Sequence, residues 1–194
     1  MLELLTRIIK PRLVLLIMSL FLLGCSTGSA VVIDADKPFK LEEFFQGDVK
    51  AYGVLLNFND ELTRNFTVDI KGNWDGDDGI LDEYFVYNDG EKQYRQWRIK
   101  KIAEGRYEGR ADDIINVAIG GVSGSTLKWR YTMALEVDGT TWNVVFDDAM
   151  YQVDGRVINY AKIKKFGITV AKVILFFEPI NAAVSTDNLI QTDR

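Results

Sequence analysis

Residues 126–151 read TLKWRYTMALEVDGTTWNVVFDDAMY, and this stretch carries the clearest information about the fold. Two arms of alternating apolar and polar residues flank Asp138-Gly139, a pair that suits a two-residue type I′ turn because both central positions need positive φ. A one-residue shift would place Lys128 and Arg130 beside the aromatic residues, so the turn and the pattern agree on one register. The predicted pairs are Val137 with Thr140, Leu135 with Trp142, Met133 with Val144, Tyr131 with Phe146, and Trp129 with Asp148.

The same period of two continues on both sides of this hairpin. Between residues 64 and 74, Phe66, Val68 and Ile70 alternate with polar residues, which indicates one buried and one solvated face. Gly or Asp-Gly recurs roughly every dozen residues, as between the strands of an antiparallel meander. The expected strands are 49–58, 64–74, 80–87, 93–102, 106–111, 114–119, 126–137, 140–151, 156–165 and 168–177.

A sheet of about ten sequential strands either curls or closes, because open twisted sheets rarely exceed roughly ten strands. We therefore predict an all-β protein whose meander closes into a calycin- or lipocalin-like barrel, with a two-sheet β-sandwich as the alternative. A short helix is expected at 37–46, capped by Asp36, before the first strand. Residues 168–177 are apolar on both faces, which predicts a strand buried on one side and covered on the other.

The first 36 residues predict where in the cell the protein is located. A basic segment is followed by an apolar run, residues 13–23, that is too short to cross a bilayer as a helix. This run ends in Leu-Leu-Gly before Cys25 and resembles the bacterial lipobox, in which the Cys is lipidated and the peptide before it is removed. We expect a signal peptide at 1–24, a lipidated tether at 25–36, a barrel domain at 37–180 and a polar tail at 181–194. Ser26, where an Asp would favour retention at the inner membrane, suggests a periplasm-facing position on the outer membrane.

Composition excludes several classes of function. Cleavage would remove Arg7, Lys10, Arg12 and Glu3, so 23 basic and 28 acidic residues become 20 and 27, and a net charge of −7 disfavours a nucleic-acid partner. The chain contains no His, which removes Ser-His and Cys-His catalysis and the usual zinc ligands. The acidic residues at 75–78 lack the spacing of a calcium loop. We expect no metal, no cofactor and no enzymatic activity.

Two carboxylates fall on predicted apolar faces. In the hairpin over residues 80–102, a three-residue loop sets Glu83 opposite Arg95, whereas a two-residue turn would set it opposite Gln96, near Arg98. Asp148 lies beside Trp129 on the aromatic face of the other hairpin. A buried carboxylate must be paired, protonated or hydrated, so these residues either tighten the strands in a polar network or line a ligand cavity.

These observations favour a barrel that binds a hydrophobic or amphipathic small molecule. One alternative is a non-enzymatic scaffold or accessory lipoprotein that docks to an envelope protein, and a carboxylate-based enzyme is a further alternative. Basic residues at 156, 162, 164 and 165 indicate either a solvated strand face or a patch resting on anionic headgroups. The candidate ligand-binding residues are Glu83, Arg95, Trp97, Arg98, Trp129, Tyr131, Trp142, Phe146 and Asp148.

An ordered set of short segments runs through most of the chain after Cys25. They are Phe44-Phe45-Gln46-Gly47, Ala51-Tyr52-Gly53, Phe66-Thr67-Val68, Gly72-Asn73-Trp74, residues 81–87, Asp89-Gly90, Arg95-Gln96-Trp97, Tyr107-Glu108-Gly109, Ala111-Asp112-Asp113, Trp129-Arg130-Tyr131 and residues 146–151. Taken together, these segments resemble an uncharacterised family of proteobacterial lipoproteins, domain-of-unknown-function family 3833. The resemblance implies the envelope location and the fold, and it carries no established activity. Ala149 stands where a Trp is usual, which suggests a divergent member with an altered pocket or partner surface there.

Overall fold

The computed structural model describes residues 38–137 and 139–180. The predicted signal peptide, the tether with Cys25, the helix cap Asp36, the turn residue Asp138 and the tail at 181–194 lie outside the described residues. Among the described residues, no helix is long and apolar enough to cross a membrane.

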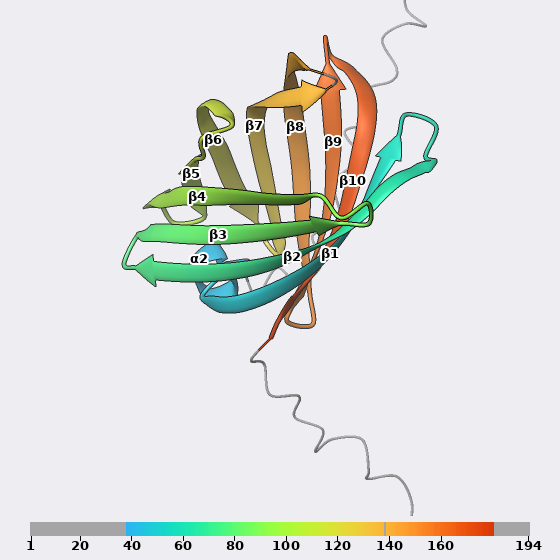
Figure 1. Cartoon of the computed structure of the whole chain (residues 1–194). Helices are drawn as coiled ribbons and strands as arrows, with labels where there is room; N and C mark the ends of the chain where they lie inside the picture. The colour runs from blue at the N-terminus through green and yellow to red at the C-terminus, as the bar shows by residue number, and fades with distance from the viewer. Residues whose placement is uncertain (1–37, 138, 181–194) are drawn as a thin grey trace, which may run out of the picture. The chain divides into compact units, whose positions relative to one another are not determined.

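The described residues form ten antiparallel strands that close into a barrel, so the barrel prediction is confirmed and the sandwich alternative is wrong (Figure 1). Each strand pairs with its neighbours in sequence, and β1 and β10 close the ring. The strands are β1 (Gly47–Asn57), β2 (Leu62–Asp75), β3 (Asp78–Tyr87), β4 (Lys92–Ala103), β5 (Arg106–Arg110), β6 (Ile114–Ser123), β7 (Thr126–Val137), β8 (Thr140–Val153), β9 (Arg156–Lys165) and β10 (Ile168–Pro179).

The register of the two decisive hairpins follows the turn chemistry. Between β7 and β8, all five predicted pairs occur, from Val137 with Thr140 to Trp129 with Asp148. Gly139 has φ of +73°, as its place in the turn requires. Between β3 and β4, Glu83 lies opposite Arg95, so the alternative that sets it opposite Gln96 is wrong.

A single helical turn, α2 (Leu41–Phe44), precedes the barrel and is shorter than the predicted 37–46. Its N-cap residue is Lys40, whose side chain makes no capping hydrogen bond. The Leu41 and Phe44 side chains are buried, and the neighbouring Phe45 ring meets the Phe177 ring of β10 edge-on at 5.7 Å. Packing against the barrel therefore stabilises this turn, since one isolated turn is unstable in water.

Contacts with β2 hold α2 and the residues after it against one end of the barrel. A Cβ at Gly72 would lie 1.6 Å from the carbonyl oxygen of Phe45, so only Gly permits this approach. The Gln46 side chain accepts a hydrogen bond from the Trp74 backbone N–H at 2.9 Å. Leu41 and Phe45 face the interior, so this segment closes one end of the barrel.

The outer face of β10 differs from the prediction that it would be covered. Ile168, Ile174 and Phe176 are partly or largely exposed, and no described element lies over them. The reason is topological: closure gives β10 two neighbouring strands and no second layer. In register beside Phe176 stand exposed Tyr52 on β1 and Ile158 on β9, so the apolar surface continues across three strands.

Three of the four basic residues of β9 contact nearby groups of the protein. Lys164 pairs with Asp147 at 2.5 Å, and Arg156, at the other end of the strand, pairs with Asp154 at 3.4 Å. Lys165 donates to the Asn143 carbonyl. The arrangement fits a solvated strand face better than a headgroup-binding patch.

Candidate ligand-binding cavity

A cavity of about 500 Å³ occupies the barrel interior. It extends from Leu41 and Phe45 at the closed end to exposed Gln93, Glu136 and Val137 at the other, where it meets solvent. Barrels of about eight strands can be filled by their own side chains, and ten strands leave more space. The volume lies within the range of small-molecule sites in proteins.

One wall of the cavity is aromatic. The Trp97 ring meets the Trp129 ring at 5.9 Å and the Tyr131 ring at 5.3 Å, both edge-on, and Tyr131 stacks on Phe146 at 5.0 Å. Two glycines make room for Trp129, because a Cβ at Gly120 would lie 2.3 Å from its ring and a Cβ at Gly109 would lie 2.5 Å from it. The small residues thus place a large flat surface on the inner face.

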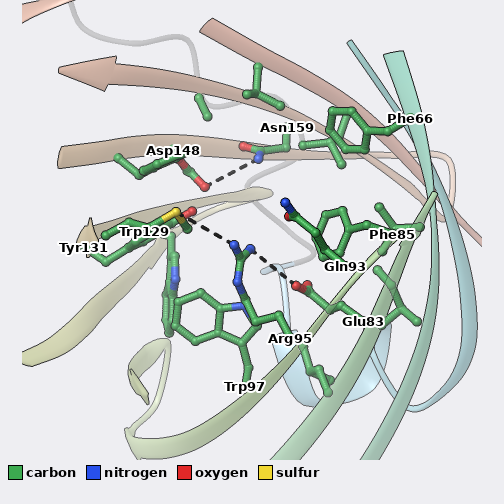
Figure 2. Close-up of a pocket in the computed structure, with 18 of the residues that line it drawn as sticks. Phe66, Glu83, Phe85, Gln93, Arg95, Trp97, Trp129, Tyr131, Asp148 and Asn159 are labelled. Atoms are coloured by element: carbon green, nitrogen blue, oxygen red, sulfur yellow. Dashed lines mark hydrogen bonds and ion pairs between the residues drawn. The ribbon is translucent and has the colours of Figure 1, made fainter. Parts of the chain in front are cut away.

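An ion-pair cluster joins β3 and β4 to the loop after β5. The Arg95 Nη1 lies 3.7 Å from Glu83 Oε2 (Figure 2), and its Nε donates to Asp113 Oδ2 at 2.9 Å. The guanidinium also lies 5.4 Å from the centre of the Phe85 ring. Arg95 is therefore shared between two carboxylates, one of which, Glu83, faces the cavity.

A second polar pair lies on β8 and β9. The Asn159 amide donates to Asp148 Oδ2 at 3.5 Å, and both residues face the cavity (Figure 2). Their exposed fractions are 3% and 4%. Each keeps one buried oxygen, Asp148 Oδ1 and Asn159 Oδ1, without a hydrogen-bond partner among the described residues.

Burial controls the protonation of both inward carboxyls. Burial raises the pKa of Glu83 from 4.5 to about 7, a change that Arg95 opposes and Asp113 reinforces. Burial likewise raises the pKa of Asp148 from 3.8 to about 7, against the hydrogen bond from Asn159. Near neutrality, each carboxyl can therefore hold or release a proton.

Polar side chains also surround the open end of the cavity. Arg64 donates to Asp89 and Glu91 at 2.8 and 2.9 Å, and its guanidinium lies 3.8 Å from the centre of the Tyr87 ring. Gln93 accepts a hydrogen bond from the Tyr87 hydroxyl at 3.0 Å. The open end is thus polar and the deeper walls are mainly apolar.

Seven of the nine predicted side chains line this cavity: Glu83, Arg95, Trp97, Trp129, Tyr131, Phe146 and Asp148. Arg98 lies on the outer face of β4, where it pairs with Asp112 at 3.0 Å. Trp142 lies near the end of β8 with 43% of its surface exposed, beside Lys165. Neither of these two lines the cavity.

Sequence reasoning missed three residues that shape the site. Arg64 and Asn159 occupy inward positions in the alternation of β2 and β9, so their parity could have identified them. Asp113 lies in the turn between β5 and β6, and no local sequence pattern predicts that its side chain contacts Arg95. Across residues 38–137 and 139–180, no group of three or more His, Cys, Asp or Glu side chains is placed to hold a metal ion. Ala149 lies outside the cavity lining, in register with Lys128 and Tyr160.

Comparisons with known proteins agree with the architecture. The model of a family described as "Protein of unknown function (DUF3833)" matches residues 19–179. Among solved structures, the S-type phycobiliprotein lyase CPES from Guillardia theta is similar, with a TM-score of 0.52 and 9% sequence identity over 71% of this chain and 89% of that one. At this identity the similarity concerns the fold alone. None of the curated proteins matches the chain.

Proposed function

The chain belongs to the family described as "Protein of unknown function (DUF3833)", and we propose that it is a lipid-anchored envelope protein that binds a hydrophobic or amphipathic small molecule inside its barrel. The observation that carries this proposal is the cavity of about 500 Å³. Side chains that merely tightened a core would close such a space, because protein interiors are packed to near-crystalline density. The similarity of the fold to that of a phycobiliprotein lyase gives secondary support.

The scaffold alternative is the weaker one. A docking lipoprotein without a ligand would combine a filled interior with an exposed apolar surface. The outer face of β1, β9 and β10 offers such a surface at Tyr52, Ile158 and Phe176. The interior, however, contains the cavity, which a pure scaffold does not need.

A second candidate function is proton transfer on the bound molecule. It is favoured by one observation: Glu83 and Asp148 line the same cavity, and both pKa values are raised to about 7. Conversion of the bound molecule would change its mass or, in an isomerisation by proton transfer, its chromatographic retention at unchanged mass. Comparing the mass and the retention time of molecules released from wild-type protein and from a Glu83→Gln, Asp148→Asn double variant tests it. Identical masses and identical retention times would eliminate this candidate and leave binding.

The anchor rests on Cys25, which lies outside the described residues. Acyl chains contribute about 0.8 kcal/mol per buried methylene, so two or more hold a protein on a bilayer without a spanning helix. We expect the wild-type chain to fractionate with outer membranes and Cys25→Ser to be released. A Cys25→Ser variant that still fractionates with membranes would argue against lipidation.

The binding proposal is tested by native mass spectrometry of the full chain extracted from membranes. We expect an added mass that denaturation releases. Ala161→Phe places a ring into the cavity from the inner face of β9 and should abolish the added mass. Ile158→Phe, on the exposed face of the same strand, is the matched control and should retain it. The absence of any added mass in the wild type, or an equal mass in both variants, would contradict binding inside the barrel.

A further inference from the structure

We infer that the polar end of the bound molecule is a hydrogen-bond donor, an amine, amide N–H or hydroxyl, and that carboxylate and phosphate ends are rejected. This inference deepens the proposed function and rests on it. Its basis is the set of polar atoms that the cavity wall presents: unpaired oxygens together with cations that are already engaged.

The two arginines of the cavity already contact carboxylates, although the buried Arg64 Nε has no hydrogen-bond partner among the described residues. Arg95 contacts Asp113 at 2.8 Å and Glu83 at 3.7 Å, and Arg64 contacts Asp89 at 2.6 Å and Glu91 at 2.9 Å. Each guanidinium thus faces two carboxylates. The other charged residues that line the cavity are acidic, namely Glu83, Glu91, Glu136 and Asp148. An anionic end would meet a net negative wall.

Buried acceptor oxygens also line the cavity. Asp148 Oδ1 and Asn159 Oδ1 are buried and accept no hydrogen bond from the described residues. Glu83 Oε2 also accepts no hydrogen bond, but it lies 3.7 Å from Arg95 Nη1 as its ion-pair partner. Asp148 and Asn159 are among the few buried polar residues of the described barrel, with exposed fractions of 4% and 3%. A buried acceptor left unpaired costs about 1–3 kcal/mol, more when it is charged. A ligand that donates to these oxygens recovers that free energy.

The apolar surroundings fix the orientation of such a ligand. The aromatic wall of Trp129, Tyr131 and Phe146 lies next to Asp148, because Trp129 pairs with Asp148 and Tyr131 with Phe146. Leu41 and Phe45 close the far end. A donor group at the Asp148 and Asn159 oxygens therefore leaves the apolar body in contact with rings and aliphatic side chains.

The raised pKa of Asp148 also favours a hydrogen-bond donor as the polar end of the ligand. Burial, with little compensating charge, raises the pKa of Asp148 to about 7, and an ammonium or N–H at its oxygen would lower that pKa by stabilising the carboxylate. A carboxylate ligand would do the opposite, since two adjacent anions cannot both ionise at low cost.

The test uses the full chain in lipid nanodiscs and three fluorescent probes that share one alkyl body and end in an amine, a hydroxyl or a carboxylate. Energy transfer from the four tryptophans, of which Trp97 and Trp129 line the cavity, reports probe binding, and Ala161→Phe gives the background for binding outside the barrel. We expect the amine and hydroxyl probes to bind about tenfold more tightly than the carboxylate probe, which corresponds to about one hydrogen bond to a charged group. This ratio in the wild type needs no variant and so does not depend on variant folding.

Substitutions then test which residues cause the preference for the amine probe over the carboxylate probe. Asp148→Asn and Glu83→Gln should each reduce the preference for the amine over the carboxylate severalfold. Asp147→Asn, the adjacent residue on the outer face of β8, is the control and should leave the ratio unchanged. A carboxylate probe that binds as tightly as the amine in the wild type, or a ratio that neither inward variant alters, would overturn the inference while leaving the proposed function intact. If no probe binds above the Ala161→Phe background, the proposed function itself fails, and the inference fails with it.

Discussion

Replacing Glu83 by Gln should change how the stability of the barrel depends on pH. The pKa of Glu83 rises from 4.5 to about 7 in the folded state because the carboxyl is buried, with Arg95 as a distant partner at 3.7 Å. A difference of one pKa unit corresponds to about 1.4 kcal/mol, so ionising Glu83 destabilises the folded state by about 3 kcal/mol relative to the unfolded chain. Gln has the same shape and does not ionise.

Glu83 makes the folded state less stable as pH rises, because the folded state binds its proton more tightly than the unfolded state does. Between pH 4.5 and about 7, the folded state holds the Glu83 proton and the unfolded state releases it, so the stabilising contribution is complete below pH 4.5 and is lost as pH rises through 7. The unfolding free energy of Glu83→Gln minus that of the wild type should therefore increase by about 2–3 kcal/mol between pH 5 and pH 8. Taking the difference cancels groups common to both proteins that do not interact with Glu83.

Equilibrium urea unfolding at pH 5, 6, 7 and 8, at constant ionic strength, measures this difference. The slope against urea should be the same for both proteins, since the surface exposed on unfolding is unchanged. A difference that stays constant across the range, or that decreases with pH, would refute the argument that burial outweighs Arg95. A constant difference would mean that the Arg95 pair compensates the buried charge completely.

Two further substitutions test the packing and the charge of the cavity wall. Gly120→Ala should destabilise the barrel by about 1–3 kcal/mol and shift tryptophan emission, because its Cβ would lie 2.3 Å from the Trp129 ring. Gly121→Ala, with open space around its Cβ, is the control and should have little effect. Thermal unfolding followed by fluorescence measures both. Arg95→Met should lower the free energy of unfolding by about 3–5 kcal/mol at pH 8, where it leaves carboxylates without their cation. The loss should be smaller at pH 5, where Glu83 is protonated. Equal losses of unfolding free energy at the two pH values, measured by urea unfolding, would contradict this assignment.

Local chemistry was sufficient to predict the strands and their register. The Asp138-Gly139 turn fixed the pairing of β7 with β8, and each inward residue then followed from a period of two, including Trp129, Tyr131 and Asp148. Closure of the barrel followed from the number of strands. The sequence left two registers possible for the hairpin between β3 and β4, because a change of one loop residue moves Glu83 from a position opposite Arg95 to one opposite Gln96.

Contacts between residues far apart in the chain, and the limits of the cavity, could not be predicted from the sequence. Asp113 reaches Arg95 from a loop 18 residues away, a contact that only the closed barrel creates. Arg98 follows the outward parity of β4 once Arg95 and Trp97 face inward, so its assignment to the site was incompatible with the register that the structure adopts. Trp142 has the inward parity of Phe146, but it lies near the strand end, where the cavity gives way to solvent. Pattern alone does not show where along a strand the cavity ends.

The claim that the barrel interior receives a molecule can be measured by titrating the full chain with an uncharged, apolar fluorescent probe and following energy transfer from Trp97 and Trp129. The account predicts saturable transfer in the wild type and in Ile158→Phe, and its loss in Ala161→Phe, whose new ring occupies the space between the walls. Transfer that is equal in all three proteins, or undetectable in the wild type, would contradict it.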